Sequence, residues 1–331
     1  MTPGTVCNTY DQRMADFDLD AMVADVKTLI EIESPSYDLP QLQKSAEALA
    51  AMIERHIGGA CQLIESSAGP HVHWRGSETT TVMLLGHHDT VFPMGTLAKL
   101  PFAVTEGVMT GPGCFDMLAG IVQALHGLAT LADTSHVELL FSADEEVGSH
   151  QSRALIEERA LACGNVLVLE PSAKDGALKT GRKGCGTFEV VVTGRASHAG
   201  LEPEAGVNAL VEASHQVLAI NQIGNASVGT TVTPTVAAVG TTDNVVPAEG
   251  RIKVDARVES ADEKARVEAA MAALTAQVDG ASVDVLGHIG RPPMPESASA
   301  TLFPNAQRSE EHTSELQSHS ELVCRLLLEK K

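Results

Sequence analysis

The 331-residue chain lacks the features that mark several large classes of protein. It contains no run of eighteen apolar residues, so we expect no transmembrane helix and no membrane partner. Its first twenty residues, MTPGTVCNTYDQRMADFDLD, include no apolar stretch suited to a signal peptide. Its six cysteines are scattered and form no CxxC pair, which indicates reduced thiols rather than a disulfide framework. Together these absences predict a cytoplasmic protein.

Positive charge is also scarce. The chain has 23 lysines and arginines against 43 acidic residues, a formal net charge of −20. No basic face is available to neutralise phosphates, so we expect no nucleic-acid partner. The hydrophobic share of 44% and the charged share of 20% are ordinary for a globular protein with a large core. The length is sufficient for two domains.

Apolar patterns divide the chain into two regions. In the first, helical spacing alternates with short apolar runs, which predicts an α/β domain with a mostly parallel sheet and helices on both faces. Its expected helices are 16–33, 40–57 and 119–131, and its expected strands are 81–85, 137–141 and 165–169. The second region is expected to be an inserted α+β unit with antiparallel character. Its expected strands are 187–193, 231–239 and 251–258, and its expected helices are 208–220 and 261–278.

These patterns predict the domain boundaries. We expect the N-terminal part of the first domain over 1–184 and the second, inserted domain over 185–291. The dipeptides Arg291-Pro292 and Pro292-Pro293 then suggest a hinge, with 292–307 starting the return to the first domain.

Polar residues follow each expected strand of the first domain at its carboxyl end. Ligands bind at that edge in open α/β sheets. Three strands that each end in His or carboxylate residues at this edge are hard to explain as ordinary polar surface residues. The residues concerned are His87, His88 and Asp89 after the first strand, Asp144, Glu145 and Glu146 after the second, and Glu170 after the third.

Each group has an ordinary interpretation as well as a functional one. His87 and Asp89 share a face of an extended segment, so one can bind a metal while the other orients its ring, although an isolated HxD is usually chance. His88 points the other way and is expected to be structural. Asp116, just before the 119–131 helix, could simply be an N-cap.

The remaining carboxylates also allow two interpretations. Glu145 and Glu146 could be a solvated acidic turn, or one could bind metal while the other takes a proton from water. Glu170 ends an apolar strand, where an unpaired charge is costly. One histidine with several carboxylates suits Zn²⁺, Mn²⁺ or Co²⁺ in a two-metal hydrolytic site. The chain has no P-loop, no strand-linked GxGxxG and no GxSxG, so chemistry by metal-activated water is the simplest account.

In combination these motifs resemble the glutamate carboxypeptidase family of di-zinc metallopeptidases, which also contains acyl-amino-acid deacylases. The matching segments are HHDTV, GPGCFDMLAG, DEEVGS and LEP. The resemblance implies two zinc ions, with cobalt or manganese as possible substitutes. It makes His87, Asp116, Glu146 and Glu170 metal ligands, with Asp116 bridging and the peptide bond after Asp116 cis. It makes Glu145 the general base and Asp89 the orienting partner of His87.

The second region resembles the lid and dimerisation domain of the same family, through ASHAG, DNVVP and VDARV. The resemblance implies that His198 stabilises the tetrahedral intermediate and that the protein is a homodimer through this domain. It links Asn244 and Arg257 to the substrate carbonyl and carboxylate. Asn244 could equally be a turn residue, and Arg257 a surface charge. One departure concerns Ala177, which stands where folate-cleaving members carry a lysine.

The resemblance implies a hydrolase that cleaves an amide bond next to a free carboxylate in a small peptide or N-acyl amino acid. An N-acyl-amino-acid deacylase and an inactive fragment that only dimerises are the alternatives. Residues 308–331 start with RSEEHTSELQS, which is what a sequencing-library adapter encodes. We interpret this segment as translated adapter and His319 as no true ligand. We therefore expect this chain to lack the last metal ligand and to be inactive.

Overall fold

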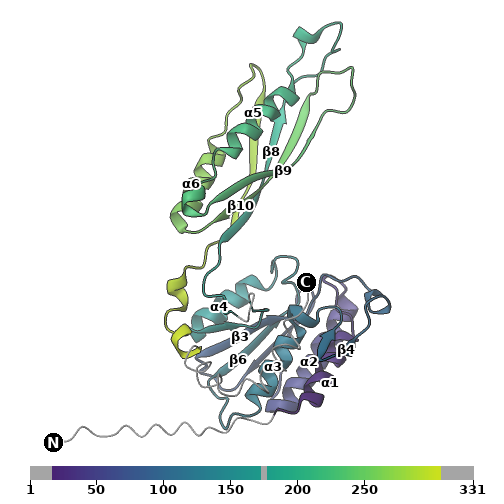
Figure 1. Cartoon of the computed structure of the whole chain (residues 1–331), viewed down its shortest axis with the longest axis vertical. Helices are drawn as coiled ribbons and strands as arrows, with labels where there is room; N and C mark the ends of the chain where they lie inside the picture. The colour runs from purple at the N-terminus through teal and green to yellow at the C-terminus, as the bar shows by residue number, and fades with distance from the viewer. Residues whose placement is uncertain (1–16, 173–176, 307–331) are drawn as a thin grey trace, which may run out of the picture. The chain divides into compact units, whose positions relative to one another are not determined.

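The computed structural model describes residues 17–172 and 177–306 (Figure 1). They divide into two compact units, one ending at Leu178 and the other starting at Lys179. None of the helices in these described residues is long and apolar enough to cross a membrane. Residues 308–331, including His319, lie outside the described part of the chain.

The first unit is built around a five-stranded sheet with the order β1-β2-β6-β3-β7. Pairing is parallel on both sides of β3, and β2 is the one strand of this sheet that runs against the others. The predicted mostly parallel sheet is confirmed. The strands are β1 (Gln62–Ile64), β2 (His71–Arg75), β3 (Val82–His87), β6 (Val137–Ser142) and β7 (Val166–Val168).

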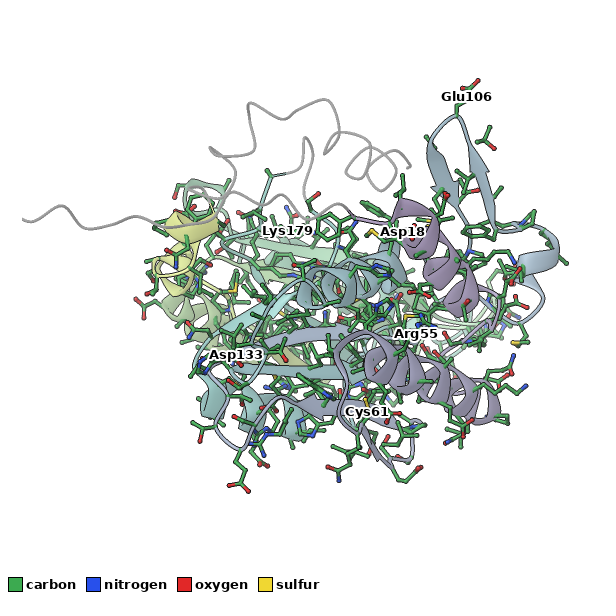
Figure 2. The ribbon with its side chains drawn as sticks, turned by 90° about the horizontal axis from the view of Figure 1, so that it is seen from below. Asp18, Arg55, Cys61, Glu106, Asp133 and Lys179 are labelled. Carbon is green, nitrogen blue, oxygen red and sulfur yellow. The ribbon has the colours of Figure 1, made fainter. Side chains whose placement is uncertain are left out.

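Helices cover both faces of this sheet, as expected. The face that carries Leu84 packs with α1, α2 and α3, whereas Met83, the next residue along the same strand, packs with α4. This alternation follows from the pleat, which turns successive side chains to opposite faces. The helices are α1 (Leu19–Ile30), α2 (Leu39–Ile57), α3 (Ala119–Leu128) and α4 (Arg153–Cys163). A hairpin of β4 (Ala103–Thr105) and β5 (Val108–Thr110) carries Glu106 at its tip (Figure 2).

The second unit is an antiparallel sheet with the order β11-β8-β10-β9, packed against two helices through its own core. Along β10, buried and exposed residues alternate, as expected of a sheet with one covered face. The strands are β8 (Gly184–Thr193), β9 (Thr231–Val239), β10 (Glu249–Val258) and β11 (Ser282–Arg291), and the helices are α5 (Ala209–Asn221) and α6 (Ala261–Ala272).

The chain segments that precede β8 and follow β11 pair with each other. Arg182 and Met294 form an isolated antiparallel bridge, and the Ser299 hydroxyl donates to the carbonyl of Thr180 at 3.0 Å. These segments are the ones that we assigned to the first domain on both sides of the insertion. In the structure both group with the second unit.

Candidate metal centre

His87 is the last residue of β3, and its side chain is almost completely buried. Its Nδ1 lies 2.9 Å from the carbonyl oxygen of Asp89 and 3.3 Å from Asp89 Oδ1. Its Nε2 faces Asp116 Oδ1 at 3.3 Å and Glu170 Oε1 at 3.7 Å. Donation from Nδ1–H to Asp89 leaves the Nε2 lone pair of a neutral ring available, which is what a metal requires.

Asp89 is fully buried and fixes two parts of the site at once. Its Oδ1 accepts the backbone N–H of Glu145 at 3.1 Å, and its Oδ2 accepts that of Glu146 at 3.2 Å. The hydroxyl of Ser36 also donates to Oδ2, at 2.7 Å. Burial opposes ionisation, but the hydrogen bonds to His87 and Ser36 hold the pKa of Asp89 below its ordinary value. The charged carboxylate therefore anchors both the His87 ring and the turn after β6.

Close packing of α3 brings Asp116 beside Glu170. Asp116 lies in the tight turn before α3, and its peptide bond to Met117 is cis, as the resemblance implies. A Cβ at Gly120, in the first turn of α3, would lie 2.3 Å from the carbonyl oxygen of Leu169. The missing side chain thus allows the start of the helix to rest against the residue that precedes Glu170.

The converging atoms form two overlapping sets of possible metal ligands. One set is His87, Glu145 and Glu170, and the other is His87, Asp116 and Glu146, with the ligand atoms of each set within 4.8 Å of one another. The grouping differs from the expected one, because Glu145, assigned as a base, falls in a ligand set with Glu170. In the described residues both sets share the same histidine.

The charges at this site are unfavourable without a cation. Burial, and then the neighbouring charge of Asp116, raise the pKa of Glu170 to about 7. Burial also raises the pKa of Glu146, and the charges of Asp116 and Glu145 act in the same direction. Against the effect of burial, hydrogen bonds to Asp116 and Asp89 raise the pKa of His87 to about 11. A donor set with this mutual repulsion fits a bound metal, which would replace protons as the compensating charge.

Three other residues define the surroundings of the site. His88 points away, and its ring nitrogens contact Ser45 Oγ at 3.1 Å and the carbonyl of Pro70 at 3.0 Å, which is the expected structural role. Ser34 and Ser36 follow the helix expected over 16–33 and were assigned no role from the sequence. The Ser34 hydroxyl donates to the carbonyl of His88 at 2.5 Å. Hydroxyls on both sides of a helix-stopping proline were the available signal.

In the second unit, His198 and Asn244 lie together. Residues His198 and Val245 form an antiparallel bridge, and the carbonyl of Asn244 accepts the N–H of Ala199 at 2.9 Å. The exposed His198 ring accepts the N–H groups of Gly200 and Leu201 at Nδ1, both at 3.1 Å. In the neutral ring the proton therefore resides on Nε2, which is then a hydrogen-bond donor.

Arg257 lies elsewhere in this unit. It is near the end of β10, whereas Asn244 precedes the start of that strand at Glu249. The strand rise of about 3.4 Å per residue separates Glu249 from Arg257 by roughly 27 Å. Its guanidinium is paired in a fork with Asp255, with both distances 3.0 Å. One copy of the unit thus does not bring Arg257 close to His198.

Comparison with known proteins agrees with this architecture. Residues 180–283 match the peptidase dimerisation domain of the M20 family. The chain is 35% identical over 248 residues to carboxypeptidase G2 of Pseudomonas sp. (strain RS-16), covering 72% of this chain and 60% of that protein. These matches support assignment of the chain to the M20 family of carboxypeptidases and deacylases.

Solved structures show the same fold. The aminopeptidase PepT from Bacillus cereus superposes with a TM-score of 0.68 at 19% identity, covering 84% of this chain and 78% of that one. An M20 family metallo-carboxypeptidase from Sulfolobus solfataricus gives a TM-score of 0.57 at 16% identity, covering 81% and 78%. The chain spans 60% of the length of carboxypeptidase G2. The relatives are enzymes by name, so the comparisons do not support our expectation of an inactive chain.

Proposed function

We propose that this M20 chain is a metal-dependent hydrolase that cleaves an amide bond next to a free carboxylate and releases an amino acid such as glutamate. The observation that carries the proposal is that Asp116 Oδ1 and Glu170 Oε1 lie 3.3 and 3.7 Å from His87 Nε2. The N–H groups of Glu145 and Glu146 are held beside this histidine by Asp89. Similarity to a protein named as a carboxypeptidase supports the same reaction class.

The proposed cofactor is a pair of zinc ions, for which cobalt or manganese could substitute. His87, Asp116 and Glu170 would hold one ion, and Asp116 and Glu146 would contribute to the other. When bound, the ions supply Lewis-acid polarisation of the scissile carbonyl and of the attacking water. The carboxylate-rich donor set and the single imidazole are consistent with this choice.

The remaining residues are assigned to binding and proton transfer. Glu145 accepts the proton of the attacking water and passes it to the leaving amine, and the buried Asp89 keeps Glu145 in place. The Nε2–H of the exposed His198 ring donates to the developing oxyanion. Asn244 binds the substrate carbonyl, and Arg257 binds the free carboxylate. Since His198 and Arg257 lie at opposite ends of their unit, we propose that the enzyme is a homodimer through this unit.

A deacylase that removes the acyl group from an N-acyl amino acid is the second candidate, because the same site serves both reactions. Ala177, in place of the lysine of folate-cleaving members, gives no support to a folate substrate. A cytoplasmic location is proposed with either function.

The test is a substrate panel on the purified chain with added Zn²⁺. Acyl-glutamates with different acyl groups, and one acyl group on different amino acids, are assayed for release of free amino acid. If the rate of zinc-dependent release depends mainly on the identity of the amino acid, the result supports a carboxypeptidase. If the rate depends mainly on the identity of the acyl group, it supports a deacylase. If Glu145→Gln, as the matched control, hydrolyses any substrate at the wild-type rate, the assignment of the site is wrong.

A further inference from the structure

A second cluster of metal-binding side chains lies among the helices of the first unit. Asp25 is in α1, His56 is near the end of α2, and His126 is in the last turn of α3. Because Asp116 precedes the first turn of α3 and His126 lies in its last, the helix separates this cluster from the metal centre.

The three side chains converge on one carboxylate oxygen. Asp25 Oδ2 lies 2.7 Å from His56 Nε2 and 2.9 Å from His126 Nε2. The two imidazole rings are 4.2 Å apart between centroids and tilted by 50°. Asp25 and His126 are only 7% and 9% exposed, so they are largely shielded from competing water. Ligand atoms of all three lie within 4.8 Å of one another, as in the metal centre.

Two features show that this position attracts positive charge. His56 and His126 each lie in the last turn of a helix, where the macrodipole favours cations. The guanidinium of Arg55 already contacts Asp25 Oδ1 at 2.5 Å (Arg55 is labelled in Figure 2). The Arg55 side chain is 59% exposed, so it can turn out into solvent and leave its position to another cation.

We propose that Asp25, His56 and His126 form a second metal site, which takes a divalent transition ion such as Zn²⁺ and ties α1, α2 and α3 together. Two imidazoles and a carboxylate are a ligand set that suits such ions. Metal–ligand bonds of about 2.0–2.1 Å place tetrahedral ligand atoms about 3.3 Å apart. The two distances from Asp25 Oδ2 to the histidine nitrogens therefore need to lengthen by only about half an ångström. Displacement of Arg55 leaves room for water as the fourth ligand.

The first experiment removes the metal centre from the measurement. Full-length His87→Ala, which lacks the imidazole shared by both ligand sets of that centre, is freed of metal and titrated with Zn²⁺ by equilibrium dialysis and thermal unfolding. We expect one tightly bound ion that raises the unfolding temperature. Adding His126→Gln should weaken this binding at least about a hundredfold, because loss of a ligand costs more than the 10- to 100-fold usual for a residue that only orients one. If His126→Gln does not fold, the more exposed His56→Gln takes its place. Equal zinc affinity with and without the cluster substitution would overturn the proposal.

The second experiment separates a metal site from a plain hydrogen-bond network. Arg55→Ala in the same background removes the competing cation, so zinc should bind about threefold to tenfold more tightly. A network that needs no metal predicts the reverse: lower stability and no gain in zinc affinity. Neither zinc affinity nor unfolding temperature depends on hydrolysis, so this test of the second site is independent of the proposed enzyme activity.

Discussion

The carboxylate of Asp89 accepts the backbone N–H of Glu145 at 3.1 Å across a sequence separation of 56 residues. The other oxygen of this carboxylate accepts the N–H of Glu146, and the ring of His87 contacts the same residue. One buried side chain therefore sets the end of β3 and the turn after β6 in a fixed relation. The positions of the proposed ligands and of the proposed base depend on it together.

Replacing Asp89 with Asn should therefore disturb the positions of both the proposed metal ligands and the proposed base. One acceptor oxygen becomes an NH₂ group, so the N–H of Glu145 or Glu146 loses its partner. We expect metal affinity to fall about 10- to 100-fold, the usual effect of losing a residue that orients a ligand, as measured by zinc titration. The control is Ser36→Ala, which removes the hydroxyl that donates to Asp89 but leaves both N–H partners. It should reduce metal affinity less. Unchanged affinity in Asp89→Asn would contradict the anchoring role.

Glu145 and Glu146 are expected to respond differently to the same substitution. Glu145→Gln should keep its metal and lose about two to four orders of magnitude in rate, the usual share of general-base catalysis. Glu146→Gln should instead weaken metal binding. Metal content and rate, measured on both variants, separate the roles. Because Glu145 also falls in a ligand set with His87 and Glu170, loss of metal from Glu145→Gln would show that it is a ligand and not the base.

Much of the fold follows from periodicity, and the errors have identifiable physical causes. The strands at 137–141 and 231–239 were predicted to within a residue, because their apolar runs carry a clear signal. β2 was missed because its His71 and His73 are polar but buried. His71 Nδ1 accepts the N–H of Ala143, and His73 Nε2 contacts Glu138 at 2.7 Å; both partners are distant in sequence.

In the second unit, one helix is shorter than the sequence predicts. The helix expected over 261–278 ends at Ala272. The buried carboxylate of Glu212 accepts the N–H groups of Gln277 and Val278, at 2.8 and 2.6 Å, and holds them outside the helix. In the candidate metal centre, the strand ends and the family resemblance pointed to residues that lie close together in the structure. Ser36 and the grouping of Glu145 with Glu170 required coordinates, because they depend on how separate loops meet.

The fully buried Glu138 should make stability sensitive to acid. Burial opposes its ionisation, but hydrogen bonds from Arg159, Thr80 and His73 outweigh this and lower its pKa to about 2. A carboxylate with a depressed pKa stabilises the fold fully above its ordinary pKa of 4.5. That stability is lost as pH falls from there through about 2.

Glu138→Gln tests this point through denaturant unfolding between pH 7 and pH 3. Because Arg159 loses its buried partner, we expect a loss of about 3–5 kcal/mol at pH 7. The loss should shrink as the pH falls, since the wild type then approaches the neutral side chain. Glu157→Gln on α4 is the control, because its pair with Arg153 is exposed on both sides and contributes little. A loss that stays constant with pH would show that Glu138 does not act through its charge.

The sharpest test of the site geometry uses two glycines of one helix. At Gly120 an added Cβ would lie 2.3 Å from the carbonyl oxygen of Leu169, whereas at Gly127 it would meet nothing within 4 Å. Gly120→Ala should push the start of α3 away from Leu169, which follows β7, and so separate Asp116 from Glu170. We expect lower stability and at least about tenfold weaker zinc binding, by analogy with loss of a ligand-orienting group. Gly127→Ala has the same helix propensity gain without the clash, so it should stabilise the protein by up to about 1 kcal/mol and leave zinc binding unchanged. If both variants bind zinc like the wild type, then close packing at Gly120 does not set the Asp116–Glu170 distance.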